Sequence, residues 1–185
     1  MAARTWSGMA VAVSGGAQAF WICPLVSESE VSDLMAAEKR AHELRQRIGP
    51  SVGLIHGKLP PTDKDAVMAA FADGKISVLV ATTVVEVGVN VPNATIMVIE
   101  QAERFGLAQL HQLRGRVGRS HHQAYAYLLT PERSAMTADA VKRLEAIESL
   151  EDLGAGFTLA THDLEIRGAG ELLGDEQSGQ IQEIG

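Results

Sequence analysis

The chain has 185 residues, which suits one domain or one domain with a small appendage, and 46% of them are hydrophobic, so wholesale disorder is excluded. Its formal net charge of -7 argues against a surface uniformly coated with basic groups for nucleic acid, although a local basic groove is compatible with it. The only cysteine, Cys23, excludes an internal disulfide and fits a reducing cytosol, and its apolar neighbours favour a buried small hydrophobe over a nucleophile.

The N-terminal segment shows no clear element of its own, and its apolar stretch is too short for a signal peptide or a membrane span. Beyond it, short apolar runs alternate with helical patterns. These runs predict five strands, at residues 19–26, 52–55, 76–83, 94–100 and 124–130. Because each run is continuously apolar, the sequence predicts an α/β fold with a parallel sheet covered by helices on both faces.

Three helical patterns fall between the predicted strands. The first begins near Ser27 and Glu30, which have the spacing of a capping box. Its apolar residues fall near one face at helical spacing: Val31, Leu34, Ala41, Leu44 and Ile48. A second helix is predicted at residues 61–74 and a short third one at 107–113.

The pattern changes after Pro131, where no strand-like run follows. Apolar residues then recur at helical spacing, at Val141, Leu144, Ile147 and Leu150. Gly154 and Gly156 break this pattern, so we expect a helical hairpin with a glycine-rich tail. The sequence therefore divides into a ragged N-terminal segment, an α/β lobe and a hairpin with a loop, at residues 1–18, 19–132 and 133–185.

The segment QLRGRVGR, at residues 112–119, concentrates positive charge in this acidic chain. Arg114, Arg116 and Arg119 are separated by glycines that remove side-chain bulk and let the backbone turn sharply. A guanidinium is a fixed cation whose planar fork suits phosphate oxygens, so the segment is typical of arginines directed at a polyphosphate. A solvated basic turn or a cluster of salt bridges is the alternative interpretation.

Several stretches resemble the motifs of superfamily-2 helicases and translocases. QLRGRVGR resembles motif VI, VLVATTVVEVGVNVPNATIMVIE at residues 78–100 resembles motif V, and VGLIHGKLPPTDKDAVMAAF at 52–71 resembles the motif IV region. The longer string ERFGLAQLHQLRGRVGR, at 103–119, resembles the group formed by RecG and transcription-repair coupling factor (Mfd), which are double-stranded DNA translocases.

This resemblance covers nearly the whole chain from about residue 19, but it is a mosaic. Residues 20–30 and the following helix look like RecG, whereas residues 119–179 look like Mfd. The resemblance implies a RecA-like parallel sheet, at residues 19–132, that forms the second lobe of a motor. It also implies that residues 133–185 form the translocation motif, a helical hairpin and loop that connect ATP hydrolysis to movement on DNA.

The resemblance implies nucleotide contacts for five residues. Arg116 and Arg119 match the arginines that face the γ-phosphate of ATP, and Gln112 matches the residue that opens motif VI. Gly88 and Asn90 match the part of motif V that faces the nucleotide. The family usually has Asp at the position of Asn90, and Asn keeps an acceptor oxygen but loses the charge.

DNA contacts are expected from two further stretches. His56, Gly57 and Lys58 follow the end of a predicted strand, where ligands of parallel sheets collect, although an ordinary polar loop would also fit. The resemblance implies that a part of motif V lies near the DNA backbone, namely Thr82, Thr83 and Glu86. It also matches two polar residues of the translocation motif, Arg167 and Gln177.

No metal site is predicted, and the chain lacks the sequence G-x-x-x-x-G-K-[ST] that would hold the phosphates of ATP. Gly57-Lys58 and Gly74-Lys75 are both followed by an apolar residue, and no predicted strand ends in an acidic pair suited to Mg²⁺. We therefore expect ATP and Mg²⁺ to bind only when this chain is paired with a first RecA-like lobe, and we expect no hydrolysis by this chain alone.

The leading hypothesis is the second RecA-like lobe of an ATP-dependent translocase in DNA repair, at stalled RNA polymerase or at stalled replication forks. Its partners would be double-stranded or branched DNA and the first lobe of the motor, with RNA polymerase nearby in an Mfd-like parent, in the bacterial cytosol or nucleoid. A non-enzymatic module that binds nucleic acid or protein is the alternative. A small-molecule enzyme has no nucleophile, acid–base pair or cofactor loop to support it.

Overall fold

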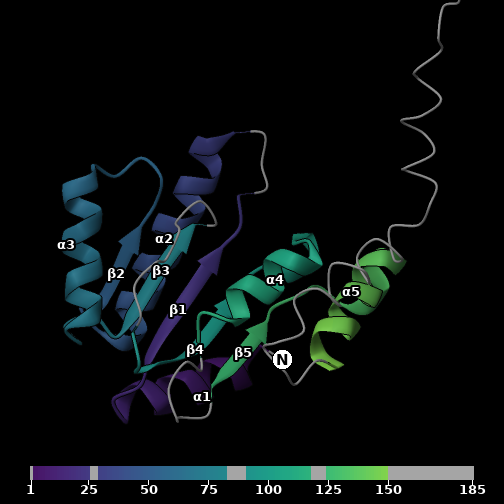
Figure 1. Ribbon diagram of the computed structural model, residues 1–185, viewed down its shortest axis with the longest axis horizontal. Coiled ribbons are helices and arrows are strands. Elements are labelled where there is room, and N and C mark those ends of the chain that lie inside the picture. The colour runs from purple at the N-terminus through teal and green to yellow at the C-terminus, as the bar shows by residue number, and fades with distance from the viewer. Residues whose placement is uncertain (1, 26–28, 83–90, 118–123, 150–185) are drawn as a thin grey trace, which may run out of the picture.

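The computed structural model describes residues 2–25, 29–82, 91–117 and 124–149 (Figure 1). Its strands are β1 (Gln18–Cys23), β2 (Val52–Ile55), β3 (Val78–Thr82), β4 (Ala94–Ile99) and β5 (Tyr125–Leu128). They form one sheet in the order β2-β3-β1-β4-β5, and every neighbouring pair is parallel. The five strands predicted from apolar runs and their parallel arrangement are confirmed.

Helices cover both faces of the sheet, as the apolar strands require. One face carries α1 (Ala2–Ser14) and α2 (Glu30–Ile48), and the other carries α3 (Pro61–Ala72), α4 (Leu107–Arg114) and α5 (Ala138–Ser149). Two short 3₁₀ helices complete the described elements, η1 (Ala102–Arg104) and η2 (Arg133–Ala135). The predicted three-layer α/β architecture is therefore the one observed.

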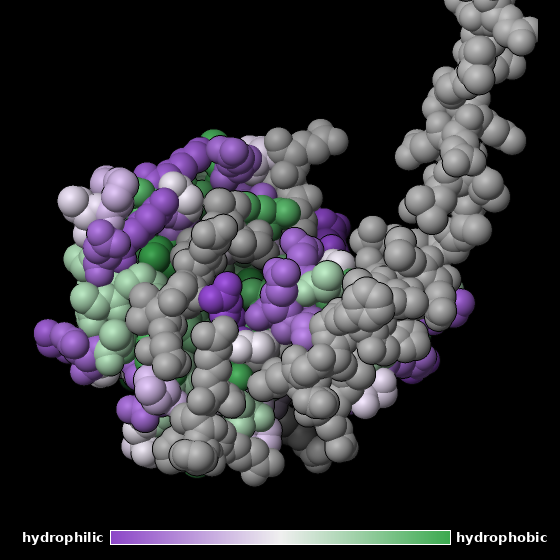
Figure 2. Space-filling model, in the orientation of Figure 1, coloured by the Kyte–Doolittle hydropathy of each residue, from purple (hydrophilic) through white to green (hydrophobic). Residues whose placement is uncertain are grey.

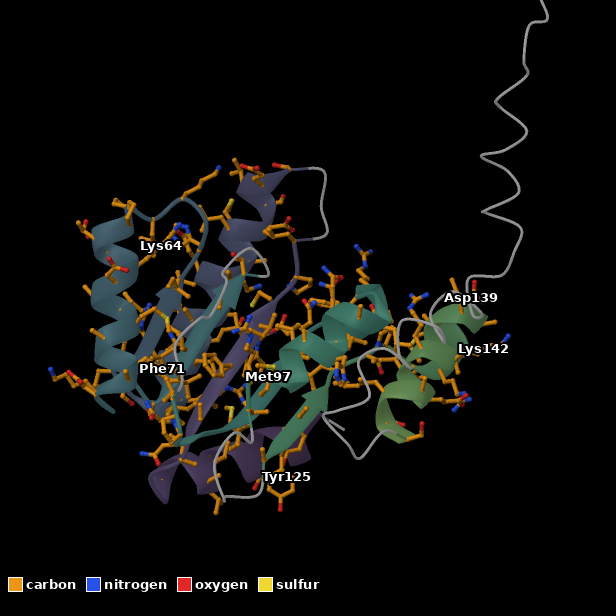
Figure 3. The ribbon with its side chains drawn as sticks, in the orientation of Figure 1. Lys64, Phe71, Met97, Tyr125, Asp139 and Lys142 are labelled. Atoms are coloured by element: carbon orange, nitrogen blue, oxygen red, sulfur yellow. The ribbon has the colours of Figure 1, made fainter. Side chains whose placement is uncertain are left out.

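The central strand β1 divides its side chains between the two cores. Phe20 and Ile22 join the core under α3, α4 and α5, whereas Trp21 and Cys23 join the core under α1 and α2. All four are almost completely buried. The ring of Phe20 meets Phe71 of α3 edge to face, with centroids 4.9 Å apart, and Figure 3 shows Phe71 pointing toward the sheet. Alternation along one strand thus places helices on both faces of the sheet.

The N-terminal segment is not ragged, which corrects our expectation of a segment without an element. Residues Ala2–Ser14 form α1, which packs on the sheet through the fully buried Met9, while Val11 is 72% exposed. Gly16 then turns the chain into β1 with a φ of 95°. The helix escaped sequence analysis because small and polar residues separate its few large apolar ones.

Two details of α2 also differ from expectation. Its N-cap is Ser29, one residue before Glu30, so a capping box led by Ser27 does not begin this helix, and Ser27 lies outside the described residues. Val31 was expected on the buried face but is 57% exposed. The buried residues of α2 are instead Asp33, Ala37, Ala41 and Leu44, so Ala41 and Leu44 lie on the predicted buried face, whereas Val31 does not.

The first helix of the predicted hairpin is present as α5. Leu144 and Ile147 bury its inner face in the core shared with α4. Arg143 of α5 donates a hydrogen bond from Nη2 to the backbone oxygen of Glu103 at 3.2 Å. This bond attaches α5 to η1, directly ahead of α4 and the arginine segment. The rest of the hairpin and its loop lie outside the described residues.

Candidate functional site

An open pocket of about 280 Å³ lies where β1, β2 and β3 end. Parallel strands end at the same edge of a sheet, and ligands of such folds collect there. Four of the residues predicted to contact DNA line this pocket, namely His56, Gly57, Lys58 and Thr82. The structure therefore brings together side chains from the end of β3 and from the loop after β2, and their contact with DNA stays a prediction.

Two residues that line this pocket each hold a buried polar atom with no hydrogen-bond partner among the described residues: Oγ1 of Thr82 and Nδ1 of His56. Thr82 is only 3% exposed. A buried polar group without a partner costs about 1–3 kcal/mol, so folded proteins rarely leave one unless a ligand or water completes it. Both atoms can donate a hydrogen bond, the imidazole nitrogen in one of its two tautomers. The pair is thus suited to an oxygen-rich ligand.

The loop that carries His56 is held in place by the protein itself. The backbone N–H of Leu59 donates to the carbonyl oxygen of His56 at 3.2 Å and closes a turn. From α3, Nζ of Lys64 donates to the carbonyl oxygen of Gly57 at 2.9 Å. Figure 3 shows Lys64 near the start of α3, beside this loop. The loop is therefore tied to α3 without any ligand.

Positive charge at the pocket comes from Lys58, whose side chain is half exposed. Its Nζ lies 3.6 Å from Oε2 of Glu30, in the first turn of α2. Figure 2 shows hydrophilic residues along the upper rim of the molecule, over the starts of α2 and α3, where the strands end. An ammonium group beside two unpartnered donors makes this edge attractive to an anion.

Three other residues that line the pocket were not predicted, namely Leu25, Glu30 and Leu34. Leu25 follows β1, and the other two lie one turn apart at the start of α2. Sequence analysis treated Glu30 only as part of a cap. Its position in the first turn of the helix that follows a strand was the signal that could have placed it at the carboxyl edge.

Gln112 and Arg116 of the arginine segment lie at and just beyond the end of α4. Leu107 and Leu110 are buried and anchor the helix, Gln112 is exposed on its last turn, and Arg116 is half-buried. Val117 is buried again, at 3% exposure, so Arg116 stands between two anchored points of the chain. Neither Gln112 nor Arg116 lines the pocket described above. The residues predicted to contact nucleotide therefore lie outside the pocket that holds the residues predicted to contact DNA.

The remaining predicted residues lie outside the described part of the chain, and their roles stay predictions: Thr83, Glu86, Gly88, Asn90, Arg119, Arg167 and Gln177. The side chain of Arg114 is likewise outside it. Within the described ranges, no group of three or more His, Cys, Asp or Glu residues is arranged to hold a metal ion. None of the helices in those ranges combines the length and apolar character needed to cross a membrane.

A polar cluster supports β1 on the α2 side of the sheet. Nε1 of Trp21 donates to Oε1 of Glu100 at 2.6 Å, Arg40 donates to the same oxygen, and the guanidinium of Arg40 lies 5.5 Å from the centre of the Trp21 ring. Burial and then the Glu100 carboxylate raise the pKa of the Cys23 thiol to about 12, against an opposite effect of Arg40. Cys23 is therefore a buried, protonated core residue, as predicted.

Known proteins match this chain with the same fold. The family described as helicase conserved C-terminal domain matches residues 10–121, from within α1 to just past the arginine segment. That match covers more than half of the chain, and the chain belongs to this family of helicase lobes. The predicted RecA-like architecture and the predicted membership among helicases are confirmed.

Two named proteins are similar over most of the chain. The transcription-repair-coupling factor of Escherichia coli strain K12 is 58% identical over 157 residues, which are 85% of this chain and 14% of that protein. The ATP-dependent DNA helicase RecG of the same strain is 48% identical over 171 residues, which are 92% of this chain and 24% of that protein. The predicted relationship to both is confirmed, while the division into a RecG-like and an Mfd-like half stays a prediction.

A solved structure of RecG bound to a three-way DNA junction is similar in fold as well as in sequence. It superposes with a TM-score of 0.74 at 40% identity, covering 92% of this chain and 21% of that one. The chain thus spans about a seventh to a quarter of the length of the relatives it matches.

Proposed function

We propose that this chain is the second RecA-like lobe of an ATP-dependent double-stranded DNA translocase that acts in DNA repair. The observation that carries the proposal is the pocket at the carboxyl edge, where Thr82, His56 and Lys58 offer donors and positive charge to one anion. The membership among helicase lobes and the similarity to RecG bound to a DNA junction support DNA as the source of that anion.

In this proposal a DNA backbone phosphate occupies the pocket. Its oxygens accept hydrogen bonds from Oγ1 of Thr82 and Nδ1 of His56, and the ammonium of Lys58 balances its charge. Backbone contacts of this kind position a protein on the duplex without reading sequence. Such contacts suit a motor that moves along DNA, because every step presents an equivalent phosphate.

The nucleotide side of the proposal rests on the arginine segment. Arg116 and Arg119 stabilise charge on the transferring phosphoryl group of ATP, with Gln112, Gly88 and Asn90 alongside. ATP and Mg²⁺ are held together with a first RecA-like lobe, which supplies the phosphate-binding loop. Closure of the two lobes moves the duplex past Thr82, and the translocation motif with Arg167 and Gln177 couples the two events. Such a motor works in the bacterial cytosol or nucleoid, on branched or polymerase-blocked DNA.

Binding of a labelled DNA duplex to the purified chain tests this proposal, with fluorescence anisotropy measured between about 50 mM and 200 mM salt. We expect the Lys58→Gln variant to bind more weakly by a similar factor on unrelated sequences. We also expect its slope of log affinity against log salt to be shallower by about one, because one phosphate contact is lost.

Lys75→Gln is the matched control. Lys75 is an exposed lysine that precedes β3, so it lies at the opposite edge of the sheet, and its ammonium pairs with Asp73 at 3.2 Å. This variant removes the same charge and should bind DNA as the wild type does. Equal losses in both variants would show non-specific attraction, and no loss in Lys58→Gln would contradict the proposal.

A further inference from the structure

Glu30 is an acidic side chain at the mouth of a pocket that otherwise suits anions. It lines the pocket, and its Oε2 is 3.6 Å from the ammonium of Lys58. The side chain of Glu30 is 83% exposed and that of Lys58 is 50% exposed, so both are free to move in solvent. A carboxylate therefore already neutralises the one cation that lines this pocket among the described residues.

The same features that attract Glu30 would attract a phosphate. Glu30 is the first residue of α2, where unpaired backbone N–H groups and the helix dipole favour negative charge. Lys58 adds a full positive charge from the loop after β2. A phosphate that binds Thr82 Oγ1 and His56 Nδ1 would therefore share Lys58 and this helix end with the carboxylate.

We propose that Glu30 is a resident anion that competes with phosphate for Lys58 and thereby biases the pocket toward ligands that bind through several phosphates. This inference rests on the proposed function, because it refines the same pocket. A single free phosphate gains Lys58 only by displacing Glu30. A DNA strand is held through neighbouring phosphates as well, so it tolerates that loss. Glu30 thus favours a continuous DNA backbone over isolated inorganic phosphate by a modest factor.

The size of the effect follows from the exposure of the pair. Exposed ion pairs contribute about 0.2–1 kcal/mol, which corresponds to a change in affinity of roughly one-and-a-half-fold to fivefold. The competition is therefore a bias that tunes affinity without blocking the pocket. It should also be strongest at low salt, where exposed charges are screened least.

The experiment is a double-mutant cycle on the full chain, read by anisotropy of a labelled duplex at low salt. The variants are Glu30→Gln, Lys58→Gln and the two combined. Glu38→Gln is the matched control, because Glu38 is an exposed glutamate on α2 two turns away that does not line the pocket. Inorganic phosphate is then added as a competitor to each protein.

We expect Glu30→Gln to tighten DNA binding by up to about fivefold. DNA binding by this variant should be inhibited more strongly by inorganic phosphate, and the gain in DNA affinity should disappear when Lys58 is also replaced. Glu38→Gln should change little. An equal gain from Glu30→Gln with and without Lys58, or the same gain from Glu38→Gln, would mean general repulsion and would overturn the inference.

The same cycle separates this inference from the function it rests on. Weaker binding by Lys58→Gln with no gain in Glu30→Gln overturns the role of Glu30 and leaves the DNA-binding pocket standing. Unchanged binding by Lys58→Gln overturns both.

Discussion

Thr82 shows how a single residue can favour ligand binding at the expense of stability. Its hydroxyl is buried at the end of β3 without a partner among the described residues. Thr82→Val keeps the shape and removes this polar atom, so we expect the free energy of unfolding to rise by about 1 kcal/mol. DNA affinity should fall in the same variant, because a donor to phosphate is lost. Urea denaturation and duplex binding measure the two effects.

Thr82→Ser is the control for that substitution, because it keeps the hydroxyl and removes a methyl group. It should lose some stability through the lost packing and bind DNA nearly normally. If Thr82→Val instead destabilised the chain and bound DNA as the wild type does, the hydroxyl would be a structural group, and the phosphate contact assigned to it would be wrong.

At the scale of elements, the docking of α1 is open to a direct test. Met9 is fully buried against the sheet, so Met9→Ala should lower the free energy of unfolding by about 2–5 kcal/mol. Val11 lies two residues away on the same helix and is 72% exposed, so Val11→Ala should change it by less than about 0.5 kcal/mol. Similar small effects from both substitutions in urea denaturation would mean that α1 is not part of the folded lobe.

Continuous apolar runs allowed the strands of the sheet to be predicted from the sequence. The helix α1, in contrast, was not predicted. The run at residues 52–55 gives a strand with the same bounds in the structure, because a strand buried on both faces must be apolar throughout. α1 escaped because its large apolar residues, Trp6, Met9, Val11 and Val13, are separated by small or polar residues and do not form an obvious apolar stripe. In α2, Ala41 and Leu44 are buried as predicted, whereas the small Ala37 and the polar Asp33 are buried without having been predicted.

The candidate site was predictable only in part, because it is assembled from distant segments. His56 was found because it follows an apolar run, and ligands collect where the strands of a parallel sheet end. Thr82 was found only through the resemblance to motif V. Glu30 and Leu34 were not found, because their place beside Thr82 depends on how α2 crosses the sheet. The unpartnered atoms could not be predicted at all, since burial and hydrogen bonding are properties of the assembled fold.

At the scale of the whole molecule, the proposal that two lobes together form the ATPase site predicts that this chain alone does not hydrolyse ATP. In the proposed function Arg116 and Arg119 face the γ-phosphate, but the sequence has no G-x-x-x-x-G-K-[ST] loop to bind ATP. The purified chain should therefore show no ATP turnover above background, with or without DNA. A coupled phosphate-release assay measures this. Clear turnover that disappears in Arg116→Ala would contradict the proposal, because it would show a complete active site within this chain.

The order of the strands has a consequence for how the chain folds during synthesis. β1 is made first but lies in the middle of the sheet, and its two neighbours, β3 and β4, are made only after residues 78 and 94 emerge. β2 likewise cannot pair until β3 has been synthesised, because β3 is its only neighbour in the described sheet. The apolar strand β1 is therefore synthesised well before either strand with which it pairs, and unpaired apolar strands of this kind are prone to aggregation until the sheet forms.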